Sequence, residues 1–181
     1  SRAKTASVIT NSGYQTHKWA VERKVTDTKE AMDYPVIRYA EVLLNFAEAE
    51  NEAEGPTAEV YDALYTLRSR AGIRRGSVTG YRYGLKQDMT KEEMREVIHN
   101  ERRIELAFEE HRYYDIRRWR EAEQIFQQPL QGMQVVEGQG VTSYTRIDVL
   151  KVNFAPRNYL YPIPYTEVNK NRNMVQNPNW N

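Results

Sequence analysis

The chain has 181 residues, which suffices for one domain with a single core, and its 26 basic and 25 acidic residues nearly cancel. A net charge of +1 provides no long-range field that collects phosphates, so the composition argues against nucleic acid as a partner. The sequence contains no cysteine and no apolar run near the ~20 residues of a membrane span, which excludes thiolate chemistry and argues against a transmembrane helix.

Amphipathic rings carry much of the apolar surface of this chain. The mean hydropathy is -0.81, while the sequence has 13 Tyr and 3 Trp. Such rings bury an apolar body and keep a polar tip for hydrogen bonding. We therefore expect some ring surface to remain available for purposes other than the core.

The first part of the chain changes character near residue 35. Residues 1–34 mix polar residues with scattered aromatics and are expected to form an extended or irregular lead-in, with a short strand through Trp19–Val25. From residue 35 to about residue 53, apolar residues recur at three and four positions, which predicts an amphipathic helix. Gly55 and Pro56 end this helix.

A second helix follows at once. Thr57 is a possible N-cap, an apolar stripe runs along the segment, and Gly72 is expected to close the helix in a left-handed conformation. Helices joined by so short a connection are antiparallel. The pair is similar to one hairpin of a tetratricopeptide-type array, although one pair does not establish a repeat.

The second half of the chain predicts further helices and long loops. Residues 74–88 contain three glycines and no apolar period, which indicates a surface loop. Thr90 and Glu93 form a capping-box pattern that begins a third helix, and a fourth helix is expected to turn its apolar side inward. The inward residues of this fourth helix are Ile116, Trp119, Ala122 or Glu123, and Phe126.

Residues 128–158 again look like a loop because they contain Gly132, Gly138 and Gly140. Pro162 and Pro164, early in the segment from residue 160, are expected to forbid a helix or a central strand, so we expect the segment to lie extended against the helical body. The sequence therefore predicts a mainly α fold with long irregular loops and an extended C-terminal segment.

The segment ERRIELAFEEHRYYDIRRWREAE, residues 101–123, carries 13 formally charged side chains among apolar ones. Helical projection turns Glu101 and Glu105 toward the interior, where carboxylates need partners. Arginines offer two-point contacts to carboxylates, so we expect a structural ion-pair network with Arg38 and Glu105 partly buried. Its expected members are Arg38, Glu41, Glu101, Glu105, Arg112, Arg117 and Arg118.

The alternative is that some of these carboxylates act as acid and base in a hydrolase. The residues in question are Glu101, Glu105, Glu109 and Asp115. Glycosidase carboxylates flank a substrate cleft and usually come from separate elements. Nothing in the sequence places a cleft between these side chains, so we favour structural pairing and expect no catalytic residue.

Four blocks together are similar to a known family. They are DYPVIRYAEVLLNFAEAENE (33–52), LYTLRSRAGI (64–73), MTKEEMREVIHNERRIELAFEEHRYYDIRRW (89–119) and LYPIPYTEVNKNRNMVQNP (160–178). As a set and in this order, they closely resemble the C-terminal half of the SusD/RagB family, the surface glycan-binding lipoproteins of Bacteroidetes-type bacteria. The resemblance makes residues 35–181 a SusD/RagB-like C-terminal helical region.

The resemblance implies a fold of tetratricopeptide-like helical pairs and a lipid-anchored location on the outer membrane at the cell surface. It implies docking onto a SusC-like TonB-dependent transporter and nutrient uptake by carbohydrate binding without catalysis. It also implies that the chain is part of a longer one, whose lipid anchor and further helical pairs lie upstream. Two positions depart from the family pattern, because Glu110 and Asn179 stand where the family often has Gly.

Several aromatic residues are candidates for contact with a sugar. Tyr81 and Tyr83, in the glycine-flanked loop, alternate in direction if the loop is extended, so one of them is a candidate, although ordinary surface tyrosines are the stronger reading; Tyr144, in the second loop, is a further candidate. Tyr14 and Trp19 are candidates that pack in the family more often than they bind. In the family the main sugar contacts tend to come from loops upstream, so the resemblance implies that the principal site is largely outside this chain.

Other kinds of chemistry are weakly supported. The three histidines have no metal-ligand spacing, and the sequence has neither a nucleophile elbow nor a glycine-rich phosphate loop, so we expect no metal and no cofactor. The cluster Arg68, Arg70, Arg74 and Arg75 suggests phosphate binding, but ion pairing or solvent exposure is the stronger reading. Peptide capture stays open as an alternative ligand, and a glycoside hydrolase as the alternative from another class.

Overall fold

The computed structural model describes residues 12–14, 16, 18, 34–138, 141–171 and 173–180. The chain divides into two compact units. Residues Arg23–Tyr113 form one, called here the helical unit, and Ser1–Glu22 with Tyr114–Asn181 form the other, called the hairpin unit. The predicted lead-in over residues 1–34, with its strand through Trp19–Val25, falls almost entirely outside the described residues.

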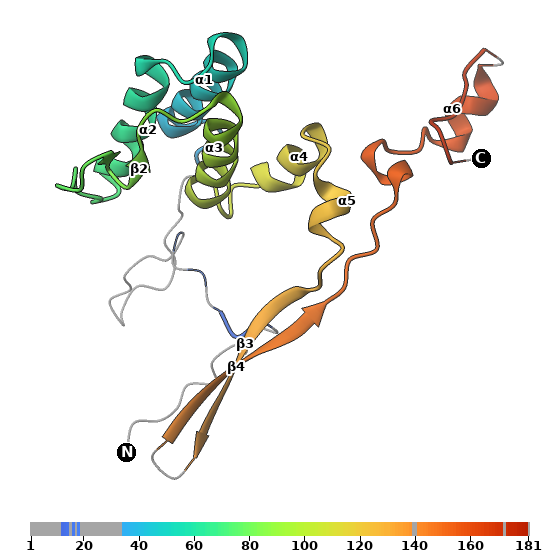
Figure 1. Ribbon diagram of the computed structural model, residues 1–181. Helices are drawn as coiled ribbons and strands as arrows, with labels where there is room; N and C mark the ends of the chain where they lie inside the picture. The colour runs from blue at the N-terminus through green and yellow to red at the C-terminus, as the bar shows by residue number, and fades with distance from the viewer. Residues whose placement is uncertain are drawn as a thin grey trace, which may run out of the picture. The chain divides into compact units, whose positions relative to one another are not determined.

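The helical unit is built from α1 (Tyr39–Glu54), α2 (Ala58–Arg70) and α3 (Lys91–Glu105), which pack together in Figure 1. Each helix carries apolar residues at helical spacing, and these meet in one core. Leu44, Leu64 and Met94 are fully buried there, one from each helix. The rest of this core is formed by Ala40, Ala47, Val60, Ala63, Leu67, Leu85, Met89, Ile98 and Leu106.

The ends of these helices follow their expected signals. Gly55 (φ 92°) and Gly72 (φ 86°) both have the positive φ that favours glycine. The Thr57 side chain accepts a hydrogen bond from Val60 N, and Thr90 and Glu93 form a complete capping box. The two predicted helices, the N-cap at Thr57 and the start of the third helix are therefore confirmed.

The predicted loop over residues 74–88 contains only a minimal hairpin, β1 (Tyr81–Arg82) paired with β2 (Leu85–Lys86). The predicted fourth helix is not continuous. The structure has α4 (His111–Arg118) and α5 (Ala122–Ile125), separated by a turn in which Arg120 has a φ of 61°. Within the described residues, every helix is too short or too polar to cross a membrane.

The hairpin unit contains two long antiparallel strands, β3 (Leu130–Gly138) and β4 (Val141–Leu150), shown in Figure 1. The prediction of a loop over residues 128–158 is therefore wrong. Gly132 is not a loop residue but is buried on β3, where the backbone of Ser12 approaches so closely that an added Cβ would lie 2.6 Å from Ser12 O. The glycine is needed for close packing inside a strand, a role that the sequence does not distinguish from a loop.

The last segment is only partly extended. A 3₁₀ turn, η1 (Pro156–Tyr159), directly precedes it, and a short helix, α6 (Tyr165–Lys170), follows an extended stretch within it. Pro164 directly precedes α6, which is compatible with a helix start, so the exclusion of helix from the whole segment is wrong. The fold class as a whole is confirmed, since the protein is mainly helical.

Candidate functional site

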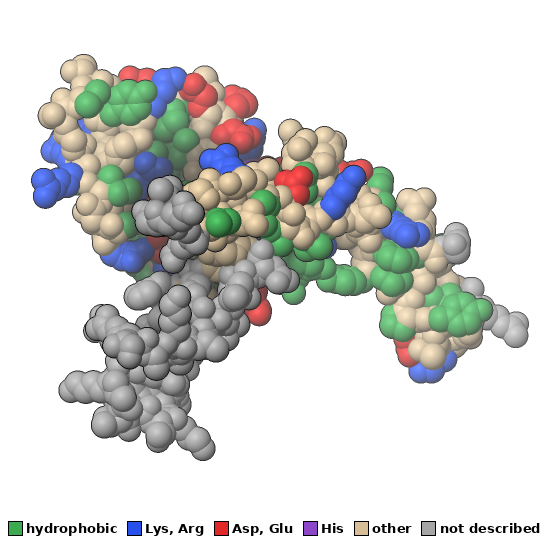
Figure 2. Space-filling model, turned by 90° about the horizontal axis from the view of Figure 1, so that it is seen from below, with side chains coloured by type: hydrophobic (Ala, Val, Ile, Leu, Met, Phe, Trp, Pro, Cys, Tyr) green, Lys and Arg blue, Asp and Glu red, His purple; other side chains and the backbone are tan. Residues whose placement is uncertain are grey.

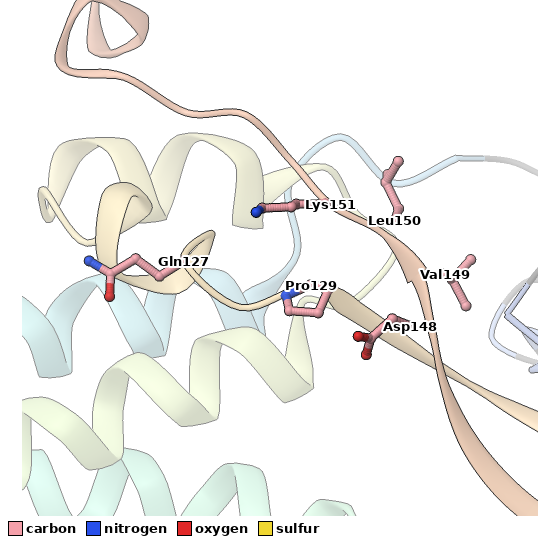
Figure 3. Close-up of a pocket in the computed structure, with 6 residues that line it drawn as sticks. All are labelled: Gln127, Pro129, Asp148, Val149, Leu150 and Lys151. Atoms are coloured by element: carbon pink, nitrogen blue, oxygen red, sulfur yellow. The ribbon is translucent and has the colours of Figure 1, made fainter.

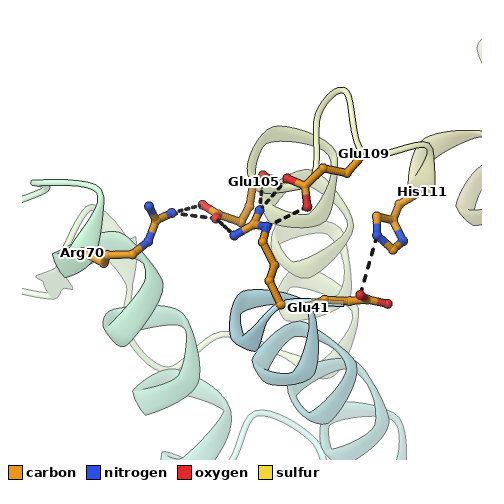
Figure 4. Close-up of polar contacts among 6 residues, drawn as sticks. Glu41, Arg70, Glu105, Glu109 and His111 are labelled. Carbon is orange, nitrogen blue, oxygen red and sulfur yellow. Dashed lines mark hydrogen bonds and ion pairs between the residues drawn. The ribbon is translucent and has the colours of Figure 1, made fainter. Parts of the chain in front are cut away.

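Arg38 lies just before α1 and forms ion pairs with Glu105 and Glu109, two residues that are labelled in Figure 4. Its guanidinium donates to Glu105 Oε1 at 2.6 Å and to the main-chain oxygen of Glu105 at 2.6 Å. It also donates to both carboxylate oxygens of Glu109, at 2.6 and 2.8 Å. Hydrogen bonding to Glu109 raises the pKa of Arg38 above its ordinary value, against the opposing effect of partial burial.

Further ion pairs extend from this arginine. The side chains of Arg38 and Glu105 are 24% and 12% exposed, so both are partly buried, as the sequence predicts. Arg70 of α2 binds both oxygens of Glu105 from the other side at 2.6 Å (Figure 4). Glu41 lies 3.7 Å from the His111 ring, and Glu101 is held by Arg68, which the sequence placed in a different cluster.

The remaining predicted members lie farther along the chain. Arg118 pairs with the buried carboxylate of Asp115 at 2.9 Å, and Arg117 lies over the Phe154 ring at 5.2 Å. Arg112 is half-buried. The structure therefore brings Arg38, Glu105 and Glu109 together and places Arg117 and Arg118 among aromatic and acidic neighbours of the hairpin unit.

A second arrangement joins three tyrosines on α2 and the small hairpin, called here the tyrosine row: Tyr61, Tyr65 and Tyr83. The centroids of Tyr61 and Tyr65 are 5.9 Å apart with a 36° tilt, and those of Tyr65 and Tyr83 are 5.2 Å apart with a 39° tilt. All three rings are half-buried. The row therefore combines packed aromatic surface with partial access to solvent.

Polar contacts hold the row in place. The Tyr65 hydroxyl and the Gln87 side-chain amide are hydrogen-bonded at 2.8 to 3.0 Å, and the Tyr61 hydroxyl accepts from Met89 N at 3.1 Å. Burial raises the pKa of the Tyr61 hydroxyl above its ordinary value. The rings are thus fixed before any ligand arrives, which lowers the entropy cost of binding.

Tyr83 occupies an unusual backbone position. Tyr83 (φ 50°) and Gly84 (φ 72°) are the two residues between the paired positions Arg82 and Leu85. Positive φ at both loop residues is the signature of a type I′ turn, which prefers Asn or Gly at the first place. A bulky residue there is strained, and Arg68 Nη1 stabilises the turn by donating to Tyr83 O at 3.1 Å.

The other aromatic candidates lie elsewhere. Tyr81 is 49% exposed on β1, beside the row. Tyr144 on β4 and Tyr14 are exposed in the hairpin unit, so neither belongs to the tyrosine row. Trp19 lies outside the described residues. Tyr61, Tyr65 and Gln87 were not among the candidates, although the i, i+4 spacing of the two tyrosines beside Val60 and Leu64 was a usable signal.

Comparison with known proteins decides the family. A model described as the SusD family matches residues 4–180. The chain belongs to the SusD family. The predicted resemblance is confirmed.

The chain is also similar to individual SusD-like proteins. SusD-like protein P2 of Formosa agariphila is 35% identical over 150 residues, which is 82% of this chain and 26% of that protein. SusD-like protein P25 of the same organism is 40% identical over 84 residues, 46% of this chain and 15% of the relative. The crystal structure of a SusD-like protein from Bacteroides fragilis is 33% identical and superposes with a TM-score of 0.63 over 80% of this chain and 25% of that one. The chain thus spans about a quarter of the first of these relatives and of the solved structure.

The two departures from the SusD-family pattern fall at left-handed positions. Glu110 has a φ of 66° immediately before α4, and Asn179 has a φ of 66° near the C-terminus. Glycine adopts this conformation without strain and Asn tolerates it, whereas Glu does not. The backbone thus keeps at Glu110 the geometry that glycine would favour.

An open pocket of about 470 Å³ lies at the base of the β3–β4 hairpin (Figure 3). Its lining consists of Gln127, Pro129, Asp148, Val149, Leu150 and Lys151. Asp148 and Lys151 bring opposite charges to one small hollow. In the described residues of this SusD-family chain, no group of His, Asp or Glu is arranged to hold a metal ion.

Proposed function

We propose that this chain is part of a cell-surface, outer-membrane component that binds a glycan without cleaving it and passes it to a SusC-like TonB-dependent transporter. Two findings support this proposal: the chain belongs to the SusD family, and it spans about a quarter of its longer relatives, as a part of such a binding protein would. The tyrosine row is the observation that carries the ligand class. A lipid anchor outside this chain would hold the protein at the membrane.

The chemistry of the row suits a sugar. A pyranose ring presents apolar C–H faces and hydroxyl edges, so its binder needs aromatic surface beside amide groups. Tyr65 and Tyr83 supply rings and Gln87 supplies the amide. By analogy with bases stacked on aromatic side chains, each well-placed ring contributes roughly 1–3 kcal/mol, which gives a modest affinity compatible with transfer to a transporter.

The carboxylates of the network are better suited to structure than to catalysis. Glu105 and Glu109 both accept hydrogen bonds from Arg38, and Glu101 accepts from Arg68. A carboxylate that acts as a general acid must reach the substrate, whereas each of these side chains is engaged by a guanidinium group. The arrangement therefore favours a binding protein over a glycoside hydrolase.

Affinity electrophoresis through gels that contain single polysaccharides tests this proposal. We expect retardation by at least one glycan, weakened by Tyr65→Ala and unchanged by Tyr165→Ala, which removes an exposed ring from α6. Absence of retardation by every glycan would contradict the proposal for this chain. New reducing ends that vanish with Glu105→Gln would replace it with a hydrolase.

Peptide binding is the second candidate, and the pocket in Figure 3 favours it. Asp148 and Lys151 offer opposite charges beside a β-strand, a combination suited to an extended backbone with charged side chains. Retention of a peptide library that is lost with Asp148→Asn, together with unchanged behaviour of Tyr65→Ala, would select this alternative.

A further inference from the structure

Two groups of arginines in the helical unit differ in their contacts. Arg38, Arg68, Arg70 and Arg95 each bind a carboxylate at 2.6 or 2.7 Å. Arg74, Arg75 and Arg82 are exposed, and no carboxylate of the described residues pairs with them. The four-arginine cluster of the sequence is thus divided, since its first two members are ion-paired and its last two are not.

The second group adjoins the tyrosine row. Arg82 stands between Tyr81 and Tyr83 on the hairpin, and the main-chain oxygen of Arg75 accepts a hydrogen bond from Tyr83 N at 2.9 Å. Arg74 directly precedes Arg75 in the chain. In Figure 2, Lys and Arg side chains gather at the left edge of the view, the side on which β1 and β2 lie in Figure 1.

The backbone that carries these arginines is anchored. Tyr81 N donates to Val78 O at 3.1 Å and Gln87 N donates to Gly80 O at 2.8 Å. Arg68 also binds Tyr83 O, so the hairpin is tied to α2. Within residues 74–88 the basic side chains are Arg74, Arg75, Arg82 and Lys86, and the one acidic side chain is Asp88, which lies near Tyr61. The neighbouring Glu93 carboxylate is held by Lys86 at 2.6 Å. The loop therefore carries a net positive charge on an anchored backbone.

We infer that the tyrosine row and Arg74, Arg75 and Arg82 together form a subsite for an acidic glycan, one that carries carboxylate or sulfate groups on its sugar rings. The rings contact a pyranose face while the guanidinium groups bind its anionic substituent in two-point contacts. A free phosphate lacks the apolar face that would use the tyrosines. This inference rests on the proposed function and narrows its ligand class.

Matched ligand pairs test the charge requirement. Galacturonate oligosaccharides and their methyl esters share one backbone, as do dextran sulfate and dextran, so each pair differs chiefly in negative charge. Exposed ion pairs are individually weak, and we expect the acidic member of at least one pair to bind the 181-residue chain roughly tenfold more tightly. The pair that responds distinguishes carboxylate from sulfate recognition. Added salt should reduce this advantage.

Matched variants locate the effect. Arg75→Gln combined with Arg82→Gln should remove most of the preference for the acidic member of the pair. Arg103→Gln removes an exposed arginine of α3 and should leave the preference intact. Arg75→Lys with Arg82→Lys keeps the charge but not the planar fork, so it should retain only part of the preference. Circular dichroism and thermal unfolding confirm that each variant is folded.

The outcomes separate this inference from the proposed function. Equal binding of both members of each pair, weakened by Tyr65→Ala, would leave the glycan-binding proposal standing and overturn the acidic subsite. An equal loss with Arg103→Gln would also overturn it, because the effect would then reflect overall charge. If the chain binds no member of either pair, both the acidic subsite and the glycan-binding proposal lose support.

Discussion

Arg38 concentrates four hydrogen bonds on one partly buried guanidinium, with Glu105 and Glu109 as its acceptors. Replacing it with Gln removes the positive charge that these two carboxylates share, although Arg70 still binds Glu105. Loss of one partner from a buried ion pair is strongly destabilising, and partial exposure reduces the cost. We expect Arg38→Gln to lower the free energy of unfolding by about 2 kcal/mol, measured by urea denaturation.

Arg70 is the matched control for this prediction. It binds the same Glu105 at 2.6 Å, but its side chain is 61% exposed. Exposed ion pairs contribute little, so Arg70→Gln should cost less than about 1 kcal/mol. Equal losses for the two variants would show that burial does not decide the strength of this network.

Glu110 is strained in a way that a single substitution relieves. Its φ of 66° costs a residue with a Cβ about 1 kcal/mol or more, whereas glycine adopts this conformation freely. Glu110 is exposed and has no ion pair among the described residues. Glu110→Gly should therefore raise the free energy of unfolding by about 0.5–1 kcal/mol after the entropy cost of glycine is subtracted.

A Glu→Gly substitution at an exposed position inside a helix should change the free energy of unfolding in the opposite direction. Glu96 lies within α3, and Glu96→Gly should lower the stability by about 1 kcal/mol because glycine disfavours a helix. Thermal unfolding of the two variants measures both effects. If Glu110→Gly destabilises the protein, the Glu110 side chain must stabilise the fold by more than the backbone strain at this position costs.

At the scale of elements, the turn between β1 and β2 positions the end of the tyrosine row. Gly84 has a φ of 72°, and a Cβ there would lie 3.4 Å from Arg68 Nη1, the group that stabilises the turn. Gly84→Ala should cost about 1–2 kcal/mol and weaken glycan binding, because the left-handed turn is strained and Tyr83 is displaced. Thermal unfolding and affinity electrophoresis report these two effects.

The substitution Tyr83→Asn distinguishes the contribution of the turn conformation from that of the Tyr83 ring. Asn is favoured at the first position of a type I′ turn, so the relief of backbone strain should offset part of the lost ring packing. We expect stability within about 1 kcal/mol of the parent chain but weaker retention by the glycan. Retention equal to that of the parent would exclude Tyr83 from the site.

Local signals explain which elements the sequence predicts correctly. The helices of the helical unit have caps that act within a few residues, such as Thr57 and Thr90. The β3–β4 hairpin was missed because Gly132 and Gly138 resemble loop residues, although VTSYTRIDV on β4 is rich in residues that favour strands. Close approach of Ser12 to Gly132 is a long-range contact, and no local pattern indicates it.

The sequence pointed to some residues of the candidate site and not to others. Tyr81 and Tyr83 were identified from their glycine-flanked loop, whereas Tyr61 and Tyr65 were assigned no binding role. Their relation to Tyr83 depends on the hairpin folding back onto α2, which brings residues 18 positions apart to 5.2 Å. Residue types alone predict the chemistry of such a site, but tertiary packing decides which rings meet.

At the scale of the whole molecule, near-equal numbers of acidic and basic side chains make carboxylate ionisation important for stability. Hydrogen bonds from Arg95 lower the pKa of Glu52, and a hydrogen bond from Lys86 is the main cause that lowers the pKa of Glu93. A carboxylate with a lowered folded-state pKa stabilises the protein above its unfolded-state pKa. This stabilisation is lost as the pH falls through the folded-state pKa.

We therefore expect the free energy of unfolding to decline as the pH is lowered from about 6 to about 3, because protonation removes these ion pairs. Glu52→Gln should make the decline shallower by removing one group that contributes to it. Glu54→Gln is the control, since Glu54 is exposed at the end of α1 and has no ion pair among the described residues. Urea denaturation across this range measures the slope. An unchanged slope with Glu52→Gln would show that the Arg95 pair does not persist in solution, because its loss would then carry no proton linkage.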